Sequence, residues 1–127
     1  MLVRNGRIAA LGTEEELREM AAGSDKTLVI DTQALPIFPD VEEYASMGLI
    51  PGGAYRNREF AAKTGYVSTA KLWLEDLVFD PQTSGGLLAA VPAEEADEIL
   101  RELKKLSLPC AVIGEVIDRE KHTLLIR

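Results

Sequence analysis

Apolar residues alternate along this chain between short β-branched runs and helical stripes, which predicts an α/β or α+β fold with a mixed sheet flanked by helices. Residues 27–31 form a compact apolar run that is typical of a buried strand. Near the N-terminus, residues 2–4 and 7–11 flank Asn5-Gly6, a pair suited to the two positive-φ positions of a type I′ turn. These first residues therefore predict a β-hairpin.

Helices and loops are expected to alternate through the first half of the chain. Thr13 and Glu16 have capping-box spacing, so a helix is predicted over residues 14–22. Asp40 is placed to cap a second helix over residues 41–47. Residues 49–57 hold too much glycine for regular structure, with another helix expected to start near residue 57. Residues 72–79 are apolar and ambiguous, and are compatible with a short helix.

The last third of the chain has the clearest pattern. An apolar run over residues 87–91 predicts a strand, and Pro92 opens a helix with one apolar face. A second strand is predicted over residues 110–117, which gives a right-handed parallel βαβ unit. Residues 123–126 follow a polar turn and are predicted to form a final antiparallel strand, closing a C-terminal hairpin.

Composition narrows the class of protein. The chain has 127 residues, of which 46% are hydrophobic and 28% are charged, as in one ordinary globular domain. No apolar run approaches the roughly 20 residues of a membrane span, so we expect a cytoplasmic protein without a membrane partner. The net charge of −7 argues against nucleic acid as a partner. The single cysteine, Cys110, excludes an internal disulfide and is expected to be buried in a strand.

The strongest candidate for chemistry is the loop Asp80-Pro81-Gln82-Thr83-Ser84-Gly85-Gly86. Paired glycines let the backbone expose N–H groups toward one point, where they bind a phosphate oxygen, and the two hydroxyls add donors. It is not a Walker loop, because no Gly-Lys-Ser/Thr follows. A proline-containing turn that eases entry into a strand is the plainer interpretation, and spacing alone favours it.

A second candidate is Pro51-Gly52-Gly53-Ala54-Tyr55-Arg56-Asn57-Arg58. Two arginines beside a flexible turn are suited to holding an anion. The alternative is an ordinary surface loop with solvated arginines.

These two segments carry a resemblance to the C-terminal domain of selenophosphate synthetases (selenide, water dikinases). Ile50-Pro51-Gly52-Gly53, two variable residues and Arg56-Asn57 resemble one motif of that family. The run from Asp80 to Leu88 matches the family signature Asp-Pro-Gln-Thr-Ser-Gly-Gly-Leu-Leu residue for residue. The similarity covers roughly residues 17–127, which we take as the domain, and leaves residues 1–16 as an atypical N-terminal segment.

The resemblance implies an enzyme that makes selenophosphate from selenide, ATP and water, with release of AMP and phosphate. In that family an N-terminal domain dimerises and binds ATP with Mg²⁺, and a related group includes aminoimidazole ribonucleotide synthetase. By analogy, the residues lining the cleft here are Gly52, Gly53, Arg56, Asn57, Asp80, Gln82, Thr83, Ser84, Gly85 and Gly86.

The sequence departs from the family in the residues that carry out the reaction. The reactive cysteine or selenocysteine, its lysine and the magnesium-binding aspartates belong to an N-terminal domain that this sequence lacks. We therefore expect no catalytic residue, no metal site and no cofactor held by this chain alone. Three functions follow: an enzyme domain needing a separate N-terminal polypeptide, a binding module that pairs with such a domain or forms a homodimer, or a decayed gene product.

Overall fold

In this computed structural model the described residues are 2–4, 7–10, 26–82, 86–107 and 109–127. They form two sheets, of which the smaller is an antiparallel hairpin of β1 (Leu2–Arg4) and β2 (Arg7–Ala10). The predicted N-terminal hairpin is therefore confirmed. Its turn at residues 5–6 and the helix expected over residues 14–22 lie outside the described residues.

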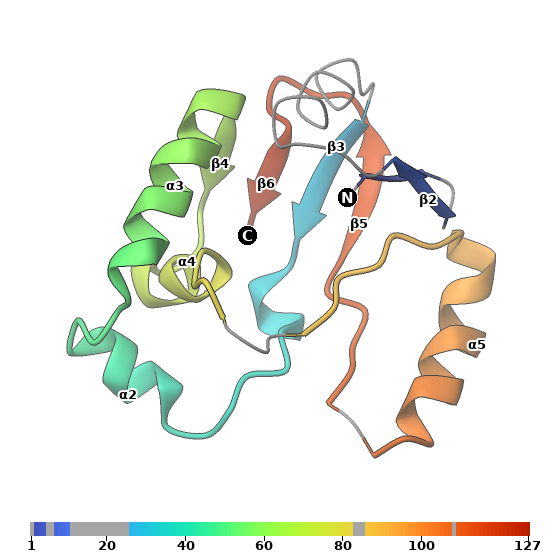
Figure 1. Cartoon of the computed structure of the whole chain (residues 1–127), viewed down its shortest axis with the longest axis horizontal. Helices are drawn as coiled ribbons and strands as arrows, with labels where there is room; N and C mark the ends of the chain where they lie inside the picture. Colours follow the sequence, from blue (N-terminus) through green and yellow to red (C-terminus); the bar gives the residue numbers. More distant parts are fainter. Residues whose placement is uncertain (1, 5–6, 11–25, 83–85, 108) are drawn as a thin grey trace.

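The larger sheet is mixed, as predicted, with the strand order β4-β6-β3-β5 (Figure 1). Its strands are β3 (Lys26–Ile30), β4 (Tyr66–Ser68), β5 (Gly114–Asp118) and β6 (Leu124–Ile126). β6 pairs in parallel with both β3 and β4, whereas β5 pairs antiparallel with β3. β3 therefore sits inside the sheet, which fits its buried Val29 and Ile30.

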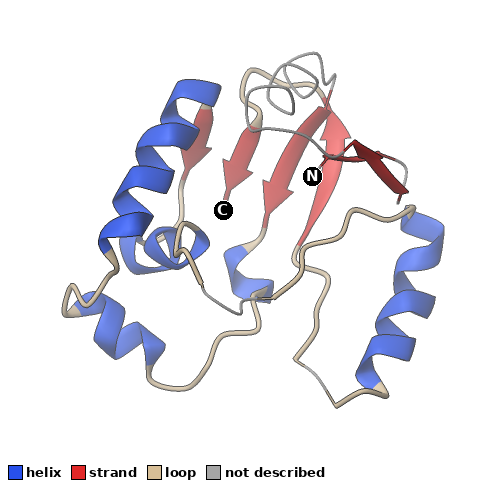
Figure 2. Cartoon of the chain, in the orientation of Figure 1, coloured by secondary structure: helices blue, strands red, loops and turns tan. Residues whose placement is uncertain are grey.

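The helices flank this sheet at both ends (Figure 2). A 3₁₀ turn, η1 (Thr32–Ala34), follows β3, and α2 (Val41–Ser46), α3 (Gly52–Thr64) and α4 (Leu72–Val78) gather on the β4 side. α5 (Ala93–Lys104) stands apart beyond β5. The short helix expected over residues 72–79 is thus confirmed. Within the described residues, no helix has the length and apolar character needed to cross a membrane.

The hydrophobic core joins elements that are far apart in the sequence. Ala54 from α3, Phe79 at the end of α4 and Ile126 from β6 are buried together. Tyr66 packs its ring against Phe79 edge to face, with centroids 5.2 Å apart. Leu124 of β6 is partly buried against the same cluster. This cluster fixes α3 and α4 against the β4–β6 side of the sheet.

The predicted C-terminal hairpin is wrong, because β5 and β6 lie on opposite sides of β3 and never pair. Thr27 explains the path of the chain between them. Its hydroxyl donates to the His122 carbonyl at 2.7 Å and accepts from the Glu120 N–H at 2.9 Å. Since Thr27 is fully buried, these bonds hold the connecting turn across the end of β3.

The predicted βαβ unit is also absent from the described residues. Residues 86–92 pair with no strand there, and β5 begins at Gly114, four residues after the predicted start. Cys110 lies outside regular structure and is half-buried rather than part of a buried strand. An apolar run shows a tendency to form a strand, but the strand forms only where a neighbour supplies backbone hydrogen bonds.

Two local predictions about helix starts are corrected. α3 begins at Gly52, five residues before the expected start, so the glycine-rich segment is largely helical. Packing of its buried Ala54 outweighs the cost of two glycines, about 1 kcal/mol each. Asp40 does precede α2, but it has a left-handed backbone (φ 65°), and its side chain makes no capping hydrogen bond to any residue that the structure describes.

Candidate functional site

The first two turns of α3 meet the segment that follows α4. The amide of Asn57 donates to the Phe79 carbonyl at 2.9 Å. Gly53 lies so close to Pro81 that a Cβ at this position would stand 2.5 Å from the proline Cγ. The two segments singled out in the sequence are therefore in contact, and Gly53 and Asn57 hold the start of the loop against α3.

The loop that begins at Asp80 is a tight turn as far as it is described. The Asp80 N–H donates to the Leu77 carbonyl at 3.2 Å, and the Gln82 N–H donates to the Asp80 carbonyl at 3.0 Å. The Asp80 carboxylate and the Gln82 side-chain amide make no hydrogen bond with the described residues. Thr83, Ser84 and Gly85 lie outside the described residues, and Gly86 is exposed.

The N-terminal end of α3 has the electrostatics of an anion site. Its first-turn N–H groups at Gly52 and Gly53 are not used inside the helix, and no acidic side chain occupies the first turn. Arg56 is exposed and has no ion-pair partner in the described part of the chain. Within the described residues, Arg56 makes no hydrogen bond or ion pair with the loop, so its place at the cleft stays a prediction.

These groups fit a phosphate better than a divalent metal. Helix N–H groups and a guanidinium are typical phosphate ligands. Magnesium needs several oxygen ligands, and the described part of this segment offers one carboxylate, Asp80. Across the described residues, no group of three or more His, Cys, Asp or Glu side chains lies close enough to hold a metal ion.

A buried ion-pair cluster, which the sequence analysis did not anticipate, joins α3 to α4 next to this site. Arg58 pairs with Asp76 through its terminal nitrogen, and its Nε lies 3.1 Å from Glu75 Oε1. Nε makes no hydrogen bond within the part of the chain that the structure describes, so its contact with Glu75 is an ion pair only. The guanidinium also lies over the rings of Tyr55 and Phe79, about 6 Å from each centroid. The sequence did hold a signal for this cluster, because Glu75 and Asp76 stand side by side within the apolar run over residues 72–79.

Tyr66 completes this cluster by donating its hydroxyl proton to Glu75 Oε1 at 2.9 Å. Burial raises the pKa of Tyr66 above that of a free tyrosine, and the bond to Glu75 raises it further. A raised folded-state pKa means that the unfolded chain loses its proton first as the pH rises. Stability from this group is therefore present below the unfolded pKa of about 10 and is lost above it.

This pKa shift predicts a pH dependence of stability. Above pH of about 10, the free energy of unfolding should fall more steeply for the wild type than for Tyr66→Phe, which keeps the ring but has no proton to lose. Urea unfolding over a series of pH values measures both slopes. Parallel slopes would show that Tyr66 does not contribute.

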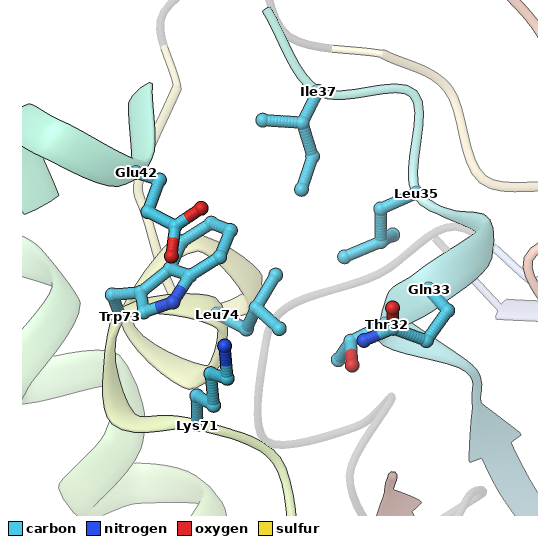
Figure 3. Close-up of a pocket in the computed structure, with 8 residues that line it drawn as sticks. All are labelled: Thr32, Gln33, Leu35, Ile37, Glu42, Lys71, Trp73 and Leu74. Atoms are coloured by element: carbon cyan, nitrogen blue, oxygen red, sulfur yellow. The ribbon is translucent and has the colours of Figure 1, made fainter. Parts of the chain in front are cut away.

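A cavity of about 260 Å³ lies near the start of α4, away from the predicted site residues (Figure 3). Trp73, Lys71 and Glu42 stand on one side of it, and Thr32, Gln33 and Leu35 on the other. The indole N–H of Trp73 is buried and has no hydrogen-bond partner among the described residues. The side chain of Trp73 is partly buried at this cavity wall.

The close approach of Gly53 and Pro81 gives a test of the site's assembly. Gly53→Ala should lower the free energy of unfolding by about 1–2 kcal/mol, because the rigid proline ring has to move. Gly52→Ala is the matched control, since an added Cβ there meets nothing within 4 Å. Chemical denaturation of both variants measures the difference. Equal stabilities would mean that the loop does not rest on Gly53.

The mixed sheet and the paired segments define an α+β domain of a known class. Residues 8–127 match the family described as AIR synthase related protein, C-terminal domain, and the chain belongs to that family. Its curated relatives include proteins named selenide, water dikinase, as the resemblance in the sequence implied. Those from Caldanaerobacter subterraneus subsp. tengcongensis and Pelobacter propionicus are 37% and 39% identical over 121 residues. That from Treponema denticola is 38% identical over 124 residues.

Each of these three alignments covers 94% of this chain but 35% of the relative. The chain thus spans about a third of the length of the curated relatives it matches, and the match corresponds to the C-terminal domain of such proteins.

Proposed function

We propose that this chain serves as the C-terminal domain of a selenophosphate synthetase, lining the cleft where ATP and selenide react. The observation that carries the proposal is the contact of the two motif segments through Gly53, Pro81, Asn57 and Phe79. It brings the described ends of the two segments together beside the first two turns of α3. The residues that we propose to line the cleft are Gly52, Gly53, Arg56, Asn57, Asp80, Gln82, Thr83, Ser84, Gly85 and Gly86.

Within this proposal the residues divide into two roles. Gly53 and Asn57 are positioning residues, since they hold residues 79–81 against α3. Arg56, the first-turn amides of α3 and the donors of residues 83–86 would bind phosphate oxygens and balance their charge. ATP, when bound, supplies the phosphoryl groups, and Asp80 and Gln82 would orient neighbouring polar groups. The Mg²⁺ ions would be held by carboxylates of another domain.

We further propose that the chain does not turn over alone and acts with an N-terminal polypeptide in the cytoplasm. Phosphoryl transfer needs metal ions and a positioned nucleophile, and this sequence does not contain the family segments that hold them.

Complementation tests this proposal. The N-terminal two thirds of the Treponema denticola relative would be mixed with this chain, and selenide-dependent AMP formation measured. We expect none from either piece alone and recovery in the mixture. The relative's own C-terminal third is the positive control. Recovery with that control but not with this chain would overturn the proposal, and AMP from a pure sample of this chain alone would overturn its inactivity.

Arg56 gives the sharpest binding prediction. Arg56→Ala should weaken ATP binding by about tenfold to a hundredfold, since a charge-assisted hydrogen bond contributes about 1.5–3 kcal/mol. Calorimetric titration of the chain with ATP and Mg²⁺ measures this, and Thr83→Ala tests the loop in the same way. Lys63→Ala is the control, because it removes an exposed cation from the far end of the same helix. Equal loss in Arg56→Ala and Lys63→Ala would indicate general charge attraction instead.

A further inference from the structure

The cavity at Trp73 contains a buried hydrogen-bond donor that the surrounding protein leaves unsatisfied. The indole N–H is a donor only, and no acceptor for it exists among the residues that the structure describes. A buried donor without an acceptor costs free energy, so native proteins rarely keep one. Since Trp73 lines a cavity, a group from outside the chain can reach its edge and supply the missing acceptor.

Two opposite charges stand at the same cavity. Lys71 and Glu42 both line it, and both residues are exposed to solvent. Neither has an ion-pair partner in the described part of the chain. Figure 3 shows Lys71, Trp73 and Glu42 together on one side of the cavity. The ammonium group and the indole donor suit a carboxylate, whereas the carboxylate of Glu42 suits a cation.

Much of the remaining lining is apolar and is held in place by the fold. Leu35, Ile37 and Leu74 contribute aliphatic side chains, and Leu74 is buried. Thr32 is fixed by two hydrogen bonds to the Arg127 carbonyl, at 2.7 Å from its N–H and 2.8 Å from its hydroxyl. A wall that is already ordered loses little entropy when a ligand binds, so this side of the cavity is suited to an apolar group.

The volume and the charges restrict the ligand. A cavity of about 260 Å³ has room for about nine waters at about 30 Å³ each, so a ligand of about nine non-hydrogen atoms fits. Aliphatic amino acids such as leucine have this size. A simple carboxylic acid would bring a second negative charge to Glu42, and a simple amine would bring a second positive charge to Lys71. A zwitterion pairs with both.

From these observations we propose that the cavity binds a free α-amino acid with an aliphatic side chain. Its carboxylate accepts the indole N–H of Trp73 and pairs with Lys71, and its ammonium group pairs with Glu42. Its side chain packs against Leu35 and Leu74. The cavity shares no residue with the candidate phosphate site, so the proposal does not rest on the proposed function.

Fluorescence gives a direct test, because Trp73 is the only tryptophan in the chain and its emission reports on this cavity alone. Titration with L-leucine should give a saturable change with a dissociation constant of about 1 mM or lower, which is in the range for ligands of about nine atoms. Isocaproate lacks the ammonium group of leucine, and isoamylamine lacks its carboxylate. We expect each to bind about tenfold more weakly or worse, since each leaves one charge of the cavity unpaired.

Two variants identify the charged groups. Lys71→Met and Glu42→Gln keep the length of each side chain and should weaken L-leucine binding about tenfold. Lys63→Met and Glu43→Gln are the matched controls, because each removes an exposed charge of the same sign that does not line the cavity. We expect both controls to bind as the wild type does. All four positions are exposed, so each variant should fold.

Nuclear magnetic resonance tests the hydrogen bond itself. The single tryptophan gives a single indole signal in a nitrogen–proton correlation spectrum. L-leucine should move the proton of this signal downfield, because its carboxylate accepts the indole N–H. Trp73→Phe keeps an aromatic ring at the cavity wall but has no donor, and calorimetry should show weaker L-leucine binding for this variant.

Three results would overturn the proposal. If L-leucine gives no saturable change at ten times the expected constant, the cavity holds water only. If isocaproate binds as tightly as L-leucine, the site accepts simple carboxylates and does not select an amino acid. If Glu43→Gln weakens binding as much as Glu42→Gln, the ligand responds to overall charge and not to this cavity. ATP binding at the candidate phosphate site is unaffected by each of these results, so the two proposals fail separately.

Discussion

Gly114→Ala is expected to lower the free energy of unfolding by about 3 kcal/mol or more, at the upper end of the cost of overpacking. A Cβ at position 114 would overlap the backbone carbonyl of Val29 in the neighbouring strand. Backbone has no alternative rotamer, so β3 and β5 would have to separate. β3 is the strand on which both the sheet order and the turn at Thr27 depend.

Chemical denaturation of the wild type and of two variants measures this effect. Gly86→Ala is the matched control, since an added Cβ there meets nothing within 4 Å and the residue is exposed. We expect Gly86→Ala to change the free energy of unfolding by less than about 1 kcal/mol. If Gly114→Ala is as stable as Gly86→Ala, the close approach of β5 to Val29 is wrong.

Local sequence patterns were sufficient to predict the helices and strands that are determined by neighbouring residues in the chain. The apolar runs of β3 and β6, the Asn-Gly hairpin and the amphipathic α5 follow from periodicity and turn residues. The start of α3 was predicted five residues too late, because the low helix propensity of Gly52 and Gly53 argued against a helix there. Its buried Ala54 and the contact of Asn57 with Phe79 outweigh that signal, and both depend on chain segments far away.

Strand neighbours could not be predicted, because the choice depends on polar contacts between distant residues. The pattern of residues 110–126 is equally compatible with a hairpin and with two strands on either side of a third. The hydroxyl of Thr27, 95 residues before His122, favours the second arrangement. Likewise the run over residues 87–91 has a strand pattern, and its pairing depends on whether a partner edge is available.

The candidate site was predictable in its residues but not in its division of roles. Motif resemblance selected Gly53 and Asn57 together with Arg56 as cleft residues. The structure adds that Gly53 and Asn57 contact the loop, which gives them a positioning role, whereas Arg56 is exposed. Arg58 was considered beside Arg56 as an anion ligand, but its charge is already balanced by Glu75 and Asp76.

Removing the positive charge that balances Glu75 and Asp76 has the second large expected effect. Arg58→Met should lower the free energy of unfolding by about 3 kcal/mol. The side chain of Asp76 is 8% exposed and that of Glu75 is 16% exposed, so both carboxylates would keep their burial and lose their cation. Methionine retains most of the packing over Tyr55 and Phe79, which leaves the missing charge as the main change.

The comparison that isolates the charge is a double variant. Arg58→Met with Asp76→Asn should recover part of the lost stability, because the uncompensated buried carboxylate is then neutral. Lys26→Ala is the control for an ordinary ion pair: its partner Asp118 is 96% exposed, and the expected cost is below about 1 kcal/mol. If Arg58→Met costs no more than Lys26→Ala in urea unfolding, the cluster does not anchor α3 to α4. In that case Asn57 and Gly53 alone would have to position the loop, and Arg58→Met would leave ATP binding unchanged.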